Sequence, residues 1–199
     1  MASRTHRIVS ALAIVAVVAG ASWYLYQKHQ LRRTGIVSEQ IVRDGESWKA
    51  DFVARIPASQ KDVFDAIEHV EDSRSDSIKS VRIVDQHGNR KTVEMVLDGP
   101  TGEITTRLAF DYFPDQGRIT YHTLDNPLLD TRAEYQLDSD GADTIVNCHQ
   151  TSRMLQSLPV PDALVKRVIS GIFVAQMADL RKSLHVSDAG ADDEADDEP

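Results

Sequence analysis

The stretch SWKADFVARIPASQKDVFDAI, residues 47–67, decides the fold of this 199-residue chain. Its first half alternates between apolar and polar side chains, which is the period-two pattern of a strand with one buried face. Pro57 ends that strand, and Ser59 follows as a helix N-cap with Asp62 three residues on. Apolar residues then recur at helical spacing through Glu71. The sequence therefore predicts a half-buried strand that leads through a short turn into a helix.

Downstream of this helix, period-two alternation returns and continues over residues 81–153. Breaks rich in Gly, Pro, Asn and Asp interrupt it and indicate turns between antiparallel strands. The predicted strands are 81–85, 92–97, 104–112, 118–124, 132–137 and 144–153.

Pro159 and Pro161 stop any further strand, and Asp162 is placed to cap a long helix that continues toward Val186. The broad apolar face of this helix consists of Leu164, Val165, Val168, Ile169, Ile172, Phe173, Met177, Leu180 and Leu184.

The order of these elements resembles the START-like, or SRPBCC, superfamily, which includes the polyketide cyclase/dehydrase and Bet v 1 types. The residues that carry the resemblance run from Trp48–Phe52 through Ile56–Ser59 into Asp62–Ile67, which is similar to the family's opening strand and first helix. The resemblance covers residues 46–186. It implies an α+β helix-grip fold, in which a curved antiparallel sheet wraps on the long C-terminal helix and leaves a hydrophobic cavity between them.

An apolar run at the N-terminus predicts a membrane anchor. Residues 8–26 carry no charge and follow a basic N-terminal segment, residues 1–7. A helix of this length reaches about 28 Å at about 1.5 Å per residue, close to the ~30 Å hydrocarbon core of a bilayer. Aromatic residues crowd its far end, where they favour the headgroup layer. We expect a transmembrane helix here, with residues 27–45 as a linker to the domain.

A cleaved signal peptide is the alternative to the anchor, because the small residues Ala19 and Ala21 form a possible cleavage site. If the segment is an anchor, the basic residues ahead of it favour an N-in orientation. That orientation places the domain outside the cytoplasm.

The net charge of −9 is distributed unevenly along the chain. The first 33 residues carry +5, and the residues from Asp188 onward carry −7. The domain between them is mildly acidic and offers no extended basic surface, so we expect no nucleic-acid binding. The acidic tail over 187–199 has nothing to bury and is expected to be disordered. The sequence identifies no protein partner.

The sequence contains no phosphate-binding loop, no nucleophile elbow and no metal-ligand motif. The single cysteine, Cys148, excludes a multi-thiolate metal site and is expected to be a small buried strand residue. His122 and His149 fall within strands and are expected on the solvent face. We therefore expect no metal and no cofactor, and we assign no catalytic residue.

Seven side chains are predicted to line the implied cavity. They are Phe110, Tyr112, Tyr121 and Tyr135 from the strands, with Ile169, Phe173 and Met177 from the long helix. A phenol in an apolar pocket orients a ligand through one hydrogen bond. Arg107 is a further polar candidate, provided that its side chain faces inward.

The chain is therefore expected to be a membrane-tethered module for binding or transport of a hydrophobic small molecule such as a lipid or quinone. One alternative is a cyclase/dehydratase-type enzyme that acts on an apolar substrate in the same cavity. A second is an interaction scaffold with a filled core, whose acidic tail would recruit a basic partner.

Overall fold

The computed structural model describes residues 34–69, 71, 78–99, 102–155 and 161–186. The basic N-terminus 1–7, the anchor or signal peptide expected over 8–26 and the acidic tail 187–199 lie outside these residues. Within the described part of the chain, no helix combines the length and the apolar character needed to cross a membrane.

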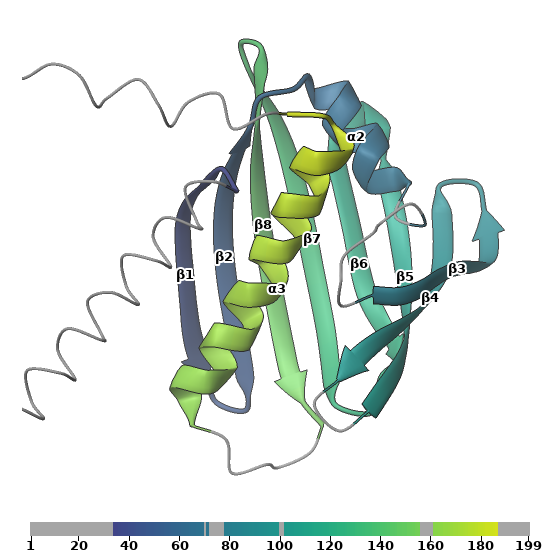
Figure 1. The fold of residues 1–199 in the computed structure, drawn as a ribbon, viewed down its shortest axis with the longest axis vertical. Coiled ribbons are helices and arrows are strands. Elements are labelled where there is room, and N and C mark those ends of the chain that lie inside the picture. Colours follow the sequence, from purple (N-terminus) through teal and green to yellow (C-terminus); the bar gives the residue numbers. More distant parts are fainter. Residues whose placement is uncertain (1–33, 70, 72–77, 100–101, 156–160, 187–199) are drawn as a thin grey trace, which may run out of the picture.

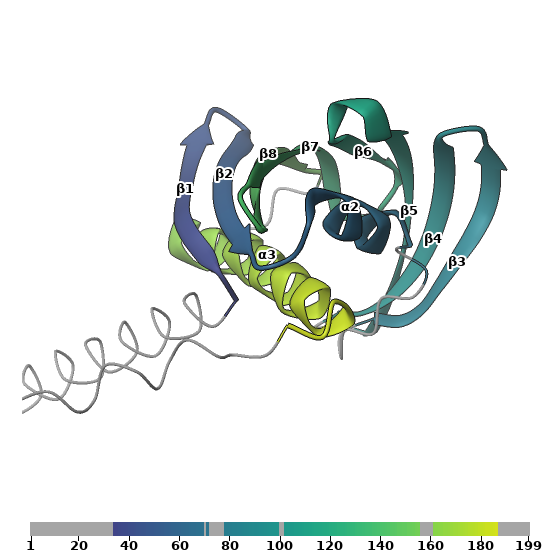
Figure 2. The same cartoon turned by 90° about the horizontal axis from the view of Figure 1, so that it is seen from above.

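A curved antiparallel sheet forms the scaffold of the domain, with strand order β1-β2-β8-β7-β6-β5-β4-β3. The strands are β1 (Ile36–Asp44), β2 (Ser47–Ile56), β3 (Ile78–His87), β4 (Arg90–Gly99), β5 (Gly102–Phe113), β6 (Arg118–Asp125), β7 (Leu129–Asp140) and β8 (Asp143–Met154). The helices are α2 (Gln60–Glu68) and α3 (Asp162–Ser183), with a 3-10 turn, η2 (Pro114–Gln116), between β5 and β6. Figure 1 shows α3 crossing the sheet diagonally, and Figure 2 shows the sheet bent around both helices. The α+β architecture predicted from the sequence is confirmed.

The predicted strands correspond to β2 through β8, but β1 was not predicted. Its residues were assigned to the linker over 27–45, whereas Ile36–Asp44 pairs antiparallel with β2. The chain turns between the two strands at Gly45, whose positive φ of 61° suits the first central position of a tight hairpin turn. Most side chains of β1 are exposed, so this edge strand lacks the apolar alternation that reveals a half-buried strand.

Helix α2 begins where the sequence predicts. The backbone N–H of Asp62 donates to Ser59 Oγ at 3.2 Å, which caps the helix. The side chains of Val63 and Phe64 are buried in the core. The Gln60 side chain donates to the backbone oxygen of Leu137 on β7 at 2.6 Å and holds the helix start against the sheet.

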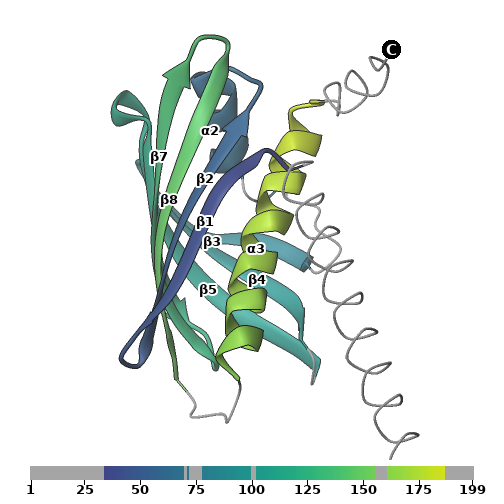
Figure 3. The ribbon, with the colours of Figure 1, turned by 90° about the vertical axis from the view of Figure 1, so that its left-hand side faces the viewer.

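Helix α3 packs on the side of the concave face formed by β1 and β2, and Figure 3 shows it as a separate layer beside the sheet. The ring of Phe173 stacks on Phe52 of β2 with centroids 4.2 Å apart. Ser170 Oγ donates to Glu39 Oε2 of β1 at 2.7 Å. The concave face next to β1 and β2 is therefore closed by direct helix-to-sheet contact.

The first turn of α3 differs in one detail from the sequence prediction. Pro161 occupies the N-cap, and Asp162 is the first helical residue. The Asp162 carboxylate still favours this helix end, because its negative charge lies near the positive end of the helix dipole. Arg43 Nη1 of β1 donates to Asp162 Oδ1 at 2.8 Å and fixes the helix start to the edge strand.

The broad apolar face predicted for α3 divides into a buried part and an exposed part, with Val165 and Leu184 half-buried. The buried part consists of Ile169, Phe173, Met177 and Leu180. The exposed part consists of Leu164, Val168 and Ile172, whose exposures are 43–50%. These three residues are spaced four apart and form one apolar stripe, because residues four apart lie on the same side of a helix.

Candidate functional site

Four aromatic side chains form a continuous row on the concave face of β5, β6 and β7. Strand alternation places Phe110, Tyr112, Tyr121 and Tyr135 on this face, and each is at most 8% exposed. The ring centroids lie 6.0 Å apart for Phe110 and Tyr112, 5.3 Å for Phe110 and Tyr121, and 6.1 Å for Tyr121 and Tyr135. We refer to these four residues as the aromatic row.

The row reaches α3 at one end. The Tyr135 hydroxyl donates to Gln176 Oε1 of α3 at 2.9 Å. Ile169, Phe173 and Met177 are buried on the same helix. The structure thus brings all seven sequence-predicted residues into the interior between sheet and helices, while their contact with a ligand stays a prediction.

The phenols of the aromatic row are neutral hydrogen-bonding groups. Burial raises the pKa of Tyr112, Tyr121 and Tyr135 above the ordinary value for tyrosine. Burial also raises the pKa of the neighbouring Cys148 thiol to about 12. At neutral pH these groups are protonated, so the phenols can donate or accept hydrogen bonds but do not act as general bases.

The interior also contains a lysine that the sequence analysis did not single out. Lys91 is 5% exposed and lies on the inward face of β4, in phase with Val93. Its Nζ donates to the backbone oxygen of Glu68 at 2.8 Å, and it lies 3.8 Å from Glu71 Oε1 and 5.5 Å from the ring centroid of Tyr112. The alternation of β4, followed backward from Val93, would have placed Lys91 inward.

Two buried oxygens close to Lys91 have no hydrogen-bond partner among the described residues. They are the Tyr112 hydroxyl oxygen and Glu71 Oε2. A buried polar group without a partner costs about 1–3 kcal/mol of stability, so such groups mark positions where a further polar molecule can bind. We call Lys91, Glu71 and the Tyr112 hydroxyl the polar recess.

The concave face of β3, β4 and β5 is covered unevenly, because Val93 and Met95 are buried while other inward side chains are not. Four inward side chains on β3, β4 and β5 are partly accessible rather than buried; they are Val81, Ile83, Leu97 and Leu108. These residues, which we call the open half, lie on the strands farthest from β1 and β2 in the sheet order. Together with the aromatic row and the polar recess they form the candidate site, which combines an apolar surface with a polar end.

Arg107 does not belong to this site. Its side chain lies on the convex face, where Nη2 is 2.9 Å from Glu94 Oε2, and Glu94 also contacts Arg82. Hydrogen bonds from Arg82 and Arg107 lower the pKa of the Glu94 carboxyl. Arg107 is therefore part of a surface ion-pair network.

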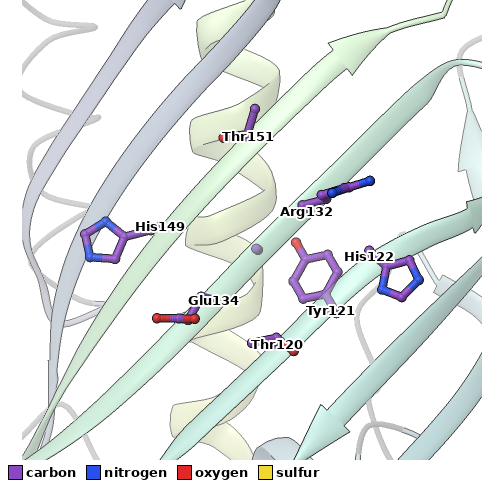
Figure 4. A pocket seen from close by; sticks show the side chains of 8 residues that line it. Thr120, Tyr121, His122, Arg132, Glu134, His149 and Thr151 are labelled. Carbon is purple, nitrogen blue, oxygen red and sulfur yellow. The ribbon is translucent and has the colours of Figure 1, made fainter.

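A pocket of about 510 Å³ opens on the convex face, opposite α3 (Figure 4). It is lined by Thr120, Tyr121, His122, Arg132, Ala133, Glu134, His149 and Thr151. His149 Nδ1 lies 2.6 Å from Asp51 Oδ1, and in the described ranges no group of three or more metal-ligating side chains comes together. Because this pocket is a shallow, open depression lined mainly by polar residues, it does not enclose an apolar ligand.

A scan against protein-family models found no match for this chain, and a search of curated proteins found none either. Solved structures do match. An aromatase/cyclase from a Streptomyces species superposes with a TM-score of 0.63 at 16% identity, covering 73% of this chain and 99% of the other.

Two further matches have the same fold. A START superfamily protein from Mycobacterium smegmatis gives a TM-score of 0.57 at 13% identity, covering 69% of this chain and 97% of its own. A STAR-related lipid transfer protein from Xanthomonas axonopodis gives 0.55 at 13% identity, covering 74% and 98%. These likenesses show that the chain has the START-like, helix-grip fold that the sequence resemblance implied.

Proposed function

We propose that this START-like chain is a membrane-tethered module that binds a hydrophobic small molecule, such as a lipid or quinone, on the concave side of its sheet. The observation that carries the proposal is the open half, where inward apolar side chains are partly accessible beside the aromatic row. The names of two fold neighbours, a lipid transfer protein and an aromatase/cyclase, support an apolar ligand class.

Burial of apolar surface supplies the driving force for such binding. A ligand that removes a few hundred Å² of apolar area from water gains about 7–10 kcal/mol before the costs of association. Polar contacts then orient the ligand rather than provide most of its affinity.

The membrane tether is the second part of the proposal. An anchor over 8–26 leaves residues 27–33 between the bilayer and Thr34, where the described structure begins. Fully extended, such a linker spans about 24 Å at roughly 3.4 Å per residue, so the domain stays close to the bilayer surface. The N-in orientation of the anchor would place the domain outside the cytoplasm.

The exposed stripe of α3 suits this location. Leu164, Val168 and Ile172 present apolar side chains to the outside of the domain. We place this stripe toward the bilayer that holds the anchor, where the lipid headgroup and acyl regions would cover it. Tethering also raises the local concentration of a ligand that the bilayer supplies.

Catalysis is the second candidate function, favoured by the likeness to an aromatase/cyclase. The neutral phenols exclude a tyrosinate base at neutral pH, so proton transfer would depend on the polar recess. If the chain is an enzyme that releases water from its substrate, the molecules extracted from wild-type protein and from Lys91→Met protein should differ by the mass of one water, as product and substrate. A binding module predicts the same molecule from both.

The binding proposal is tested by organic extraction and mass spectrometry of the full-length chain purified in a non-ionic detergent. We expect about one apolar molecule per protein. The variant Leu108→Lys places a charge in the open half and should no longer retain the apolar molecule. Thr105→Lys, on the exposed face of the same strand, is the matched control and should retain it. Wild-type protein that is repeatedly empty would contradict the proposal.

The tether is tested by washing membranes with alkaline carbonate and measuring the intact mass of the protein. An anchored chain stays in the pellet and keeps its N-terminal segment. Release of the chain into the wash, or a mass that corresponds to cleavage after Ala21, would overturn the tether and support the signal-peptide alternative.

A further inference from the structure

The position of the Tyr112 hydroxyl is fixed by the packing of its ring. Tyr112 lies at the end of the aromatic row, stacked with Phe110 at 6.0 Å between centroids and edge-on to Phe64 of α2 at 6.3 Å. The residue is 1% exposed. Because the ring is held between two others, its hydroxyl cannot turn outward to water. A molecule lying along the row would therefore place one end against this hydroxyl.

The charges around the hydroxyl disfavour an anion. Lys91 supplies one positive charge, but the carboxylates of Glu68 and Glu71 both lie close enough to act electrostatically on Tyr112. The Lys91 ammonium is already bonded to the Glu68 backbone oxygen at 2.8 Å. The Glu71 carboxylate lies 3.8 Å from this ammonium. Because that carboxylate already balances the one positive charge, a bound carboxylate or phosphate would add a like charge in a buried site.

The C-terminal end of α2 also disfavours an anion near the Tyr112 hydroxyl. The helix ends at Glu68, and its last carbonyl groups carry the negative end of the helix dipole. Lys91 partly neutralises this end through its bond to Glu68. An anionic headgroup would meet these carbonyl oxygens, whereas a neutral headgroup would not be repelled.

The unpartnered atoms define what a neutral headgroup must offer. Glu71 Oε2 can only accept a hydrogen bond when ionised, while the Tyr112 hydroxyl can donate or accept one. A single hydroxyl group can donate to the carboxylate and accept from the phenol. A ketone or ester carbonyl satisfies only the phenol.

We propose that the polar recess selects apolar molecules that end in a neutral hydroxyl, as in a long-chain alcohol, sterol-like alcohol or phenol, over those that end in a carboxylate or phosphate. This specificity rests on the proposed function, because it requires that the open half binds an apolar molecule. Tyr112 and Glu71 determine the specificity, and the aromatic row and the open half hold the apolar body.

The test uses the full-length chain in a non-ionic detergent at pH 8, with Nile red as a neutral reporter of the interior. Displacement of the dye is measured with 1-dodecanol and with dodecanoate, which share chain length and differ in headgroup. Partition into detergent is common to all protein variants, so ratios between variants report on the protein. In the wild type we expect 1-dodecanol to bind at least about tenfold more tightly than dodecanoate, because one favourable hydrogen bond to a charged group contributes about that factor.

Tyr112→Phe should weaken the binding of 1-dodecanol by about two- to tenfold, the range for one neutral hydrogen bond, and should change the binding of dodecanoate less. Glu71→Gln should reduce the discrimination against dodecanoate, because it removes one negative charge. Thr105→Ala on the convex face of β5 is the control and should match the wild type in both affinities.

Two results would overturn the proposal while the binding function survived: a ratio of the two affinities in Tyr112→Phe equal to that in Thr105→Ala, or a ratio in Glu71→Gln equal to that in Thr105→Ala. A wild-type protein that does not bind Nile red would instead contradict the proposed function, and with it this specificity.

Discussion

The two sides of the concave face differ in how completely they are covered. Beside β1 and β2, α3 contacts the sheet directly, and residues such as Phe52 and Ile56 are fully buried. Toward β3, the open half leaves Leu97 and Leu108 partly accessible. The tyrosine hydroxyls differ as well. The Tyr135 hydroxyl donates a hydrogen bond to Gln176 of α3, whereas the Tyr112 hydroxyl has no hydrogen-bond partner among the described residues.

This difference assigns different roles to two parts of one sheet. The side covered by α3 supplies close packing, which stabilises the fold. The open half and the polar recess retain apolar surface and hydrogen-bonding capacity that the described protein atoms do not use. Substitutions on the side covered by α3 should therefore mainly lower stability. Substitutions in the open half should mainly weaken ligand binding.

The largest difference is expected for large-to-small substitutions. Phe173→Ala removes the ring stacked on Phe52 and should lower the free energy of unfolding by about 3–5 kcal/mol. Leu108→Ala removes a partly accessible side chain and should cost less than about 2 kcal/mol. Urea denaturation of both variants measures the two values. Equal losses would show that the open half is packed as closely as the other side.

Alkaline pH should destabilise the domain by favouring ionisation of the buried Cys148 thiol. The ordinary pKa of a cysteine thiol is 9.0, and burial raises the pKa of Cys148 to about 12. The protonated thiol therefore contributes fully to the free energy of unfolding below pH 9, and this contribution is lost as the pH rises toward 12. The loss amounts to about 1.4 kcal/mol for each pH unit in this range. Urea denaturation at pH 8 and pH 10 measures it.

Cys148→Ala is the control for this pH effect and should show a smaller decrease between the two pH values. The buried thiol should also react with a thiol reagent in the native protein only as fast as the domain opens. Immediate stoichiometric labelling at pH 8 would contradict its burial.

The two tyrosines at the ends of the aromatic row should respond with opposite signs. Tyr135→Phe removes the hydrogen bond to Gln176 and should cost about 0.5–1.5 kcal/mol. Tyr112→Phe removes a buried hydroxyl without a partner, so in protein stripped of ligand it should be neutral or stabilising. Thermal unfolding of both variants after delipidation checks the signs. A clear loss in Tyr112→Phe would indicate that the hydroxyl already has a partner, such as a structural water.

The smallest effect is expected at the surface. Arg43→Gln breaks the ion pair with Asp162 that joins β1 to α3, and both partners are more than half exposed. Such a pair contributes about 0.2–1 kcal/mol, and salt should weaken it. Denaturation at low and high ionic strength measures the contribution. A loss comparable to that of Phe173→Ala would mean that this contact, rather than core packing, holds α3 in place.

Most of the fold could be predicted from the sequence because its strands are half buried. Strands β2 through β8 carry alternating apolar residues, and Ser59 provides a local cap for α2. Strand β1 was missed because it lies at the sheet edge with most side chains exposed, so its pairing leaves no apolar pattern. Its position depends on contacts with β2 and α3 that are distant in sequence.

The site was predictable in its apolar part and not in its polar part. The parity of Phe110 and Tyr135 along their strands predicts that both side chains point inward, and the structure places them there. Lys91 was missed because a lysine is expected at the surface, although its parity matches that of Val93. Periodicity also gave the width of the apolar face of α3 but not which part of it meets the sheet, because that depends on how the helix crosses the strands.

The most direct test of the central claim is a methyl NMR titration of the full-length chain, labelled at Ile, Leu and Val, with 1-dodecanol. We expect saturable shift changes at Val81, Leu97 and Leu108, with little change at Ile56 of β2 on the side that α3 covers. Changes confined to the covered side or to methyl groups near the convex pocket, or no saturable change at all, would contradict the claim that the open half is the ligand-binding surface.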